Sequence, residues 1–313
     1  MRMKCFEDKK RIVLDRRSIL CGAISVALTA VLLGICLTPM SKTEKYDVVL
    51  LGDSVIGNRA IYLCDDVNVY VEKQTGLKVF NGGFGGSRMA ISPVESEADC
   101  SNSWCMANLA RNIGLNTWDA ARASMAYADR YKGTNRQVFE GYVERLNKLS
   151  RIDFREVKVL IIEHGTNDYN RGIPIDNQKD PFDKTTFAGA LRSSLSFLQG
   201  NYPDLQIVLL TPALCALGEE GYLSTEKDWG GGLLEAYVEK ELEIAAEFNL
   251  DVIDYYRNSG ITADNIYEYT VDGLHPNAEG IALLGDAIAA YLKGNLYENN
   301  GTNVGVGRME ETD

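Results

Sequence analysis

The apolar residues of this chain form five short, nearly continuous runs separated by longer polar stretches. Runs of this length, rich in Val, Leu and Ile, are typical of strands that are buried on both faces of a sheet. The predicted strands are Asp47–Leu51, Leu77–Phe80, Val157–Glu163, Leu205–Leu210 and Leu250–Ile253.

Helix-length segments with a periodic apolar face alternate with these runs. The predicted helices are Ala60–Lys73, Arg136–Leu149, Thr185–Leu198, Leu233–Phe248 and Asn277–Leu292. Pro276 and Asn277 are start signals for the last of them. Strands that alternate with helices predict an α/β fold, a five-stranded parallel sheet covered by helices on both faces.

Two connections are longer than is usual in a compact domain. Ser87–Thr134 contains Trp104 and Trp118, and Pro212–Gly232 contains Trp229 and three consecutive glycines. Long loops in compact domains are usually either functional or disordered. We expect them to form a wall of a binding site or to pack only on themselves.

An uncharged apolar stretch from Ile19 to Leu37 precedes the predicted domain and is long enough to cross a bilayer as a helix. Basic residues come before it, which predicts that residues 1–18 stay in the cytoplasm, 19–38 span the membrane and the rest lies outside. We expect a catalytic domain over 44–295 and a disordered, Asn- and Gly-rich tail over 296–313. A cleaved signal peptide, leading to secretion, and a lipoprotein site at Cys36 are the alternatives.

Charge divides at the same place. Residues 1–42 carry eight Lys or Arg and three Asp or Glu, a net charge of +5, which leaves −17 for the rest of a chain whose total is −12. An acidic outer domain repels nucleic acid, so no nucleic-acid partner is expected, and it favours a neutral or cationic substrate.

Four of the seven cysteines lie in the outer domain: Cys64, Cys100, Cys105 and Cys215. Export permits disulfides, and Cys100 and Cys105 are close enough in sequence to pair, or else they remain small buried apolar side chains. No cysteine pair has metal-site spacing with histidines nearby, so we expect neither a metal nor a cofactor.

Polar motifs follow the first three predicted strands and a fourth precedes the last helix. They are Gly52-Asp-Ser54, Asn81-Gly-Gly-Phe-Gly-Gly86, His164-Gly-Thr-Asn-Asp168 and Asp272-Gly-Leu-His-Pro276. Ligands of open α/β sheets bind beyond the carboxyl ends of the strands, so motifs far apart in sequence are expected to meet at one edge. Each motif alone is also compatible with a turn or a helix cap.

Together the motifs resemble the four blocks of the SGNH hydrolases, also called GDSL esterases and lipases, over about Tyr46 to Leu292. The resemblance implies a flavodoxin-like three-layer α/β/α fold and a Ser54–His275–Asp272 catalytic triad. It also implies an oxyanion hole from the backbone N–H groups of Ser54 and Gly86 and the side-chain amide of Asn167.

Three other polar residues of the motifs are assigned supporting roles. Asp53 and Asp168 are expected to hold loops together by hydrogen bonds. His164 is the only other histidine of the chain and therefore the rival base, but its place at the end of a strand favours a partly buried supporting residue.

The resemblance implies hydrolysis of acyl esters, and the anchored or exported acidic domain favours an acetyl ester of a carbohydrate or cell-wall glycan. An O-acyltransferase that uses the same residues and a non-catalytic glycan-binding protein are the alternatives. A complete Ser–His–Asp set argues against the last one, since a protein that only binds is free to lose these residues.

Overall fold

The fold was analysed in a computed structural model, which describes residues 44–57, 66–92, 101–131 and 136–297. The predicted membrane helix over 19–38, the tail beyond 297 and Cys100 lie outside the described residues, so these expectations stay predictions. None of the helices within the described ranges is long and apolar enough to cross a membrane.

A five-stranded sheet with the strand order β2-β1-β3-β4-β7 forms the centre of the domain, and all of its pairings are parallel. Every predicted strand is confirmed, with bounds shifted by one to three residues. The strands are β1 (Val48–Gly52), β2 (Val79–Gly83), β3 (Val159–Glu163), β4 (Gln206–Leu210) and β7 (Asp251–Ile253).

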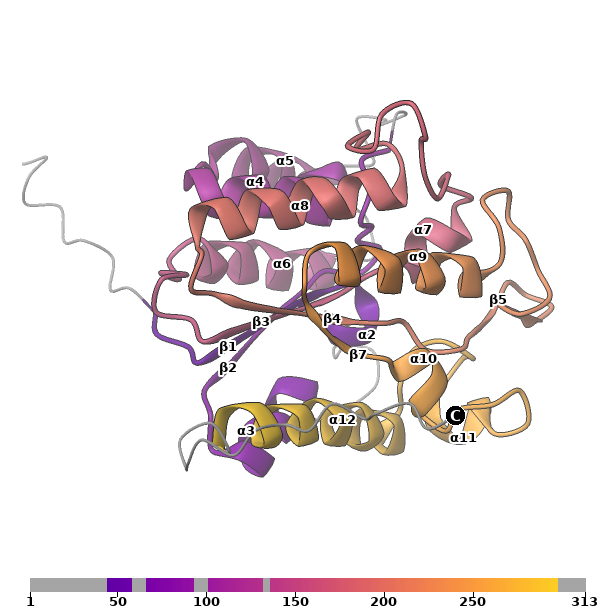
Figure 1. The fold of residues 1–313 in the computed structure, drawn as a ribbon. Coiled ribbons are helices and arrows are strands. Elements are labelled where there is room, and N and C mark those ends of the chain that lie inside the picture. Colours follow the sequence, from indigo (N-terminus) through magenta and orange to yellow (C-terminus); the bar gives the residue numbers. More distant parts are fainter. Residues whose placement is uncertain (1–43, 58–65, 93–100, 132–135, 298–313) are drawn as a thin grey trace, which may run out of the picture. The chain divides into compact units, whose positions relative to one another are not determined.

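Helices cover both faces of this sheet, as the alternating pattern predicted (Figure 1). One face carries α3 (Val67–Thr75) and α12 (Ala278–Tyr297). The other carries α4 (Met106–Leu115), α5 (Asp119–Tyr131), α6 (Arg136–Leu149), α8 (Phe187–Asn201) and α9 (Leu234–Glu247). The layers are therefore α/β/α.

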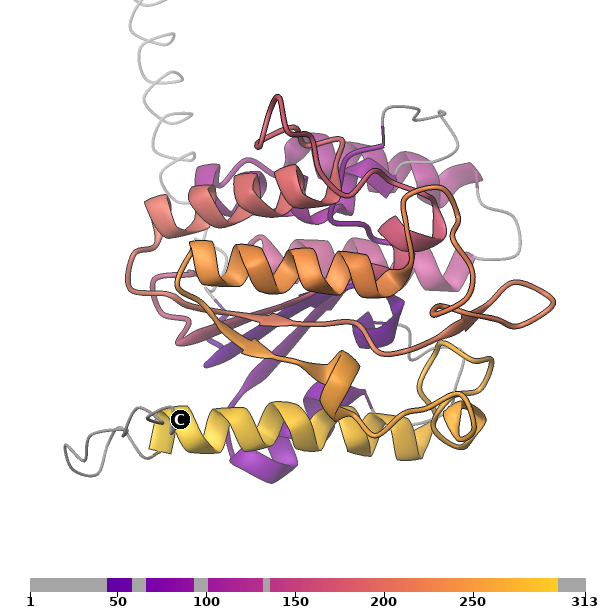
Figure 2. The same ribbon diagram turned by 45° about the vertical axis from the view of Figure 1, so that its right-hand side comes forward.

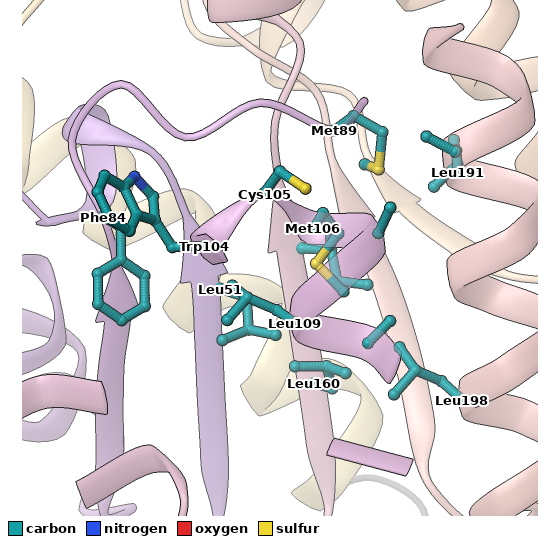
Figure 3. Close-up of a cluster of buried hydrophobic side chains, with 14 of the residues drawn as sticks. Leu51, Phe84, Met89, Trp104, Cys105, Met106, Leu109, Leu160, Leu191 and Leu198 are labelled. Atoms are coloured by element: carbon teal, nitrogen blue, oxygen red, sulfur yellow. The ribbon is translucent and has the colours of Figure 1, made fainter. Parts of the chain in front are cut away.

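Alternate residues of each strand supply the two cores, because successive side chains of a strand point to opposite faces. Val49 and Leu51 of β1 belong to the core beneath α4–α6, α8 and α9, whereas Val48 and Leu50 belong to the core beneath α3 and α12. Figure 3 shows part of the first core, in which Leu51 lies near Leu109 of α4.

The expectation of a structureless loop over Ser87–Thr134 was wrong. Within it lie the short 3-10 helix η2 (Ser101–Trp104) and the helices α4 and α5. Trp104 and Trp118 are buried in the core on that face, so they pack the domain and do not line a binding site. The Pro212–Gly232 connection contains a small hairpin, β5 (Ala216–Leu217) and β6 (Tyr222–Leu223).

Short helices complete the carboxyl edge of the sheet. They are α2 (Ser54–Gly57), α7 (Thr166–Asn170), α10 (Tyr255–Asn258) and α11 (Ile266–Tyr269). Figure 2 shows the β5–β6 hairpin and α11 on the same side of the domain. The polar motifs at the ends of β1, β2 and β3 lie at this edge.

Candidate active site at the carboxyl edge of the sheet

Ser54 and His275, which are 221 positions apart, are in hydrogen-bond contact. Ser54 is the first residue of α2, directly after β1, and its Oγ lies 2.9 Å from His275 Nε2. The Nδ1 of the same ring lies 2.7 Å from Asp272 Oδ2. A hydroxyl, an imidazole and a carboxylate in this order form the arrangement that activates a serine for attack on a carbonyl.

The loop that carries Asp272 and His275 is folded around the aspartate itself. Asp272 Oδ1 accepts hydrogen bonds from the backbone N–H groups of Leu274 (3.1 Å) and His275 (2.8 Å). Burial alone raises the pKa of Asp272, but the hydrogen bonds and positive charge of His275 outweigh it, and the pKa lies below its usual value. Asp272 therefore stays ionised beside the imidazole ring.

Three N–H donors lie on the loops around Ser54. Among the described residues, the backbone N–H groups of Ser54 and Gly86 donate no hydrogen bond. Gly86 has φ +73°, a conformation that favours glycine, and the space where a Cβ would stand is empty. Asn167, on α7, donates from Nδ2 to Asp53 Oδ2 (2.8 Å), which leaves the second N–H of its amide available.

The glycine-rich motif after β2 is held by polar side chains that the sequence did not single out. The Tyr142 hydroxyl accepts the Gly85 N–H (2.6 Å), and the Arg145 guanidinium donates to the carbonyls of Gly57 (3.1 Å) and Gly83. Both side chains come from α6. Nothing in their spacing marked them, because their role depends on α6 packing beside β2.

Asp168, to which the sequence assigned a supporting role, is fully buried. Its carboxylate accepts the backbone N–H groups of Met89 (2.7 Å) and Ala90 (2.9 Å). Burial raises its pKa to about 7, although these hydrogen bonds act in the opposite direction. The residue ties the segment after Gly86 to α7, and so to Asn167.

His164 is fully buried and does not contact Ser54. Its Nε2 lies 2.9 Å from Ser87 Oγ, which itself donates to the Trp104 carbonyl (2.8 Å), so the imidazole is the donor to Ser87. Burial lowers the pKa of His164 to about 3, and the ring is neutral at physiological pH. The structure thus places His275 beside Ser54 and His164 beside Ser87.

Glu163, the last residue of β3, is buried against the Gly52-Asp-Ser54 turn, and the sequence motifs had not included it. Its Oε2 faces the backbone N–H of Asp53 at 3.4 Å. Burial, and then the charge of Asp53, raise the pKa of Glu163 well above its usual value. The signal in the sequence was an acidic residue at the end of an otherwise apolar strand.

The described residues bear on the possible Cys100–Cys105 disulfide and on metal binding. Cys105 is buried, and its Sγ donates to the Asn102 carbonyl (3.2 Å), but Cys100 lies outside the described residues. The pairing of the two stays open. Within the described ranges, no cluster of three or more His, Cys, Asp or Glu has metal-binding geometry.

Comparison with known protein families gives one match. The model of the GDSL-like lipase/acylhydrolase family matches residues 79–283, a segment that includes Gly86, Asn167, Asp272 and His275 and begins after Ser54. No curated protein matches the chain.

Solved structures resemble the domain at low sequence identity. A protein from Lactobacillus plantarum is 19% identical with a TM-score of 0.55, over 80% of this chain and 98% of that one. A possible lipase from Chitinophaga pinensis is also 19% identical, with a TM-score of 0.50, over 79% and 97%. At these identities the likeness concerns the fold alone.

Proposed function

We propose a mechanism and a substrate class for this chain, which belongs to the GDSL-like lipase/acylhydrolase family and is therefore an ester hydrolase. Ser54 is the nucleophile of a serine esterase that removes acyl groups, acetyl above all, from a carbohydrate. The observation that carries the mechanism is the continuous contact from Ser54 Oγ through His275 to Asp272, at 2.9 Å and 2.7 Å.

The first half of the reaction forms an acyl-enzyme. Ser54 Oγ attacks the ester carbonyl while His275 Nε2 takes its proton, and Asp272 stabilises the resulting imidazolium. The carbonyl oxygen becomes an oxyanion held by the N–H groups of Ser54 and Gly86 and the second amide N–H of Asn167. Collapse expels the alcohol, which receives the proton from His275.

Water completes the cycle. His275 removes a proton from a water molecule as its oxygen attacks the acyl-enzyme carbonyl, and a second oxyanion forms in the same place. When it collapses, the carboxylic acid leaves and Ser54 Oγ recovers its proton from His275. The ester, one water molecule and the three side chains balance both halves.

Exposed aromatic side chains beside the catalytic loop favour a carbohydrate as the alcohol part. Tyr222 of β6 is 40% exposed and Tyr267 of α11 is 62% exposed. The hairpin is tied to the catalytic loop by the hydrogen bond from Ala216 N to Gly273 O (2.8 Å). Open aromatic faces suit the apolar C–H faces of sugar rings.

Neighbouring side chains hold this aromatic surface in place. The rings of Tyr222 and Trp229 meet edge to face with centroids 6.3 Å apart. The Lys227 ammonium lies 5.1 Å from both centroids, a distance at which cation–π attraction operates. The ring of Tyr222 is therefore supported by side-chain contacts that need no ligand, which favours a low entropic cost of binding there.

Activity of the domain from Ser41 onward against p-nitrophenyl acetate and longer p-nitrophenyl esters tests the mechanism. We expect Ser54→Ala to lower kcat by about 10⁴–10⁶, because the only nucleophile of the site is removed. A purified Ser54→Ala protein with near-normal turnover would rule out the serine mechanism.

The substrate class has its own test, in which acetylated xylan is compared with p-nitrophenyl acetate. We expect Tyr222→Ala and Tyr267→Ala to raise KM for the polysaccharide several-fold and to leave the small ester unchanged. Leu115→Ala is the control, since Leu115 is a similarly exposed apolar side chain (47%) on α4. Equal KM values for xylan in all three variants would argue against the aromatic surface.

The extracytoplasmic location also remains a proposal, supported by the apolar segment 19–37 and the basic residues before it. External protease added to intact cells should digest the catalytic domain and spare the first 17 residues. Full-length protein found in the cytoplasmic fraction would contradict this topology.

A further inference from the structure

We propose that Glu163 is a positioning residue of this site, which acts through Asp53 to hold the side-chain amide of Asn167 toward the oxyanion. This inference rests on the proposed function, because it assigns a task to a residue that lies beneath the hole and does not touch substrate. Three contacts from three different elements carry it.

The first contact joins β3 to the turn before α2. Glu163 pairs in register with Gly52 of β1, and its side chain is 2% exposed. Its Oε2 lies 3.4 Å from the Asp53 backbone nitrogen, and a Cβ added to Gly52 would stand 3.0 Å from the same oxygen. The carboxyl group is therefore packed directly beneath the Gly52-Asp-Ser54 turn.

The second and third contacts belong to the side chain of Asp53, which is 1% exposed. Its Oδ1 accepts the backbone N–H of Val55 in α2 (2.8 Å), and its Oδ2 accepts Nδ2–H of Asn167 in α7 (2.8 Å). One carboxylate thus fixes the helix that carries the nucleophile and the amide that faces the oxyanion. An amide held by one N–H can direct the other only along a fixed line.

The charges of Glu163 and Asp53 depend on each other because both carboxyl groups are buried side by side. Burial and the nearby Asp53 charge raise the pKa of Glu163 well above its usual value, whereas the pKa of Asp53, raised by burial, is about 6. Two negative charges this close repel each other, so the pair favours a single negative charge. The hydrogen bonds that Asp53 accepts from Val55 and Asn167 favour that charge on Asp53.

Packing of the core does not require a carboxyl group at position 163. Glu163 Oε1 is buried without a hydrogen-bond partner among the described residues, and a buried polar atom of this kind costs free energy. The preceding residues of β3, from Val159 to Ile162, are all apolar and buried. A leucine at position 163 would suit the core, so the acid points to a task at the turn.

The test compares two replacements of Glu163 by kcat and KM on p-nitrophenyl acetate. We expect Glu163→Leu to lower kcat by about 10- to 100-fold with KM within twofold, because the oxyanion forms only in the transition state. Glu163→Gln should keep kcat within about threefold, because its amide oxygen can still accept the Asp53 N–H. Wild-type kcat in Glu163→Leu, or a change in KM alone, overturns the proposal.

A matched control and a double variant separate positioning from general damage. Glu241 of α9 is equally buried (1% exposed), its carboxyl oxygens have no hydrogen-bond partner among the described residues, and its charge acts on Glu163 only through space. Glu241→Leu therefore removes a buried carboxyl group without breaking a hydrogen bond of the site, and it should keep wild-type kcat. In an Asn167→Ala background, Glu163→Leu should lower kcat less than threefold further. The full 10- to 100-fold loss in that background would mean that Glu163 does not act through Asn167.

Two further measurements keep the outcomes distinct. If Glu163→Leu does not fold, Asp53→Asn interrupts the same series of contacts at Asp53, next to Asn167. It should lower kcat at unchanged KM, and wild-type kcat in this variant overturns the proposal. Ser54→Ala decides the esterase mechanism independently, so a failure of the proposed function is not confused with a failure of the Glu163 assignment.

Discussion

At the scale of single residues, the site is built from side chains that each make two contacts. Asp272 accepts backbone N–H groups with one oxygen and the His275 ring with the other. Asp53 does the same for α2 and Asn167. Shared acceptors of this kind fix the reacting groups relative to one another before substrate binds, which is how an enzyme avoids reorganisation during the reaction.

Asn167 allows a prediction that distinguishes transition-state stabilisation from substrate binding. Asn167→Ala should lower kcat by roughly 10²–10³ with little change in KM, because it removes one donor to the oxyanion. Asn167→Asp should be at least as poor, since a carboxylate would face both the oxyanion and Asp53. Steady-state kinetics on p-nitrophenyl acetate measure both variants, and a rise in KM alone would assign Asn167 to substrate binding instead.

The sequence could point to candidate site residues because they lie close together in short motifs, three of which follow strand ends. Ser54, Asn167 and His275 were predicted in this way, and their catalytic roles stay predictions. Glu163 was visible only as an acidic residue at the end of an apolar strand, because its contact with Asp53 follows from the register that pairs β3 with β1. Tyr142 was missed for a similar reason, since only packing of α6 brings it to Gly85.

At the scale of elements, α2 is held against β2 by a close backbone approach. A Cβ at Gly57 would lie 2.2 Å from the Gly83 carbonyl oxygen, a distance that no side chain tolerates. The backbones of α2 and β2 meet there with no room for a side chain on either glycine. Because α2 begins at Ser54, this approach also sets the height of the nucleophile above the sheet.

Gly57→Ala should therefore lower both stability and activity. Forcing a methyl group into this contact costs roughly 1–3 kcal/mol and displaces the helix that carries Ser54. Gly141→Ala is the matched control: nothing lies within 4 Å of its Cβ position in α6, and alanine favours a helix. The melting temperature and kcat should both fall for Gly57→Ala and stay unchanged for Gly141→Ala. A Gly57→Ala protein with wild-type stability and activity would contradict the close approach.

Strands were easier to predict than helices in this chain. Each strand is a compact apolar run, so all five were found. Helix α4 begins after Cys105, whose side chain does not cap the helix. The sequence therefore lacks the capping residue that usually marks a helix start. Its apolar residues, such as Leu109 and Ile113, do follow helical spacing, but the expectation from the sequence was one long connection over the whole of Ser87–Thr134. Packing of α4 against α8 then outweighs these weak local signals.

At the scale of the whole domain, several buried carboxyl groups make stability depend on pH in an unusual direction. Burial raises the pKa values of Asp53 (to about 6) and Asp168 (to about 7), and raises those of Glu163 and Glu241 well above the usual value. A group with a raised folded-state pKa stabilises the fold below its unfolded pKa, and this contribution is lost as pH rises through the folded value. The lowered pKa of the buried His164 acts in the opposite direction below its usual value of 6.5, but the four carboxyl groups outnumber it, so stability should fall between pH 5 and pH 7.

Glu241 isolates one part of this effect. Its carboxyl group is buried without a partner among the described residues, so Glu241→Leu should raise the melting temperature by a few degrees at pH 8 and by less at pH 5. Glu243 lies on the exposed face of the same helix and pairs with Lys240. Glu243→Gln removes a negative charge from the surface and should change neither melting temperature appreciably. Calorimetry from pH 5 to 8 makes the comparison; parallel curves for wild type and Glu241→Leu would contradict it.

The separation of 221 positions between Ser54 and His275 has a consequence for biosynthesis. The nucleophile is made early, and the base and its carboxylate partner are made near the end of the domain, so a growing chain holds a serine with nothing to activate it. Only a chain that extends past His275 holds all three groups of the proposed triad, so the mechanism proposed here ties full activity to completion of the domain.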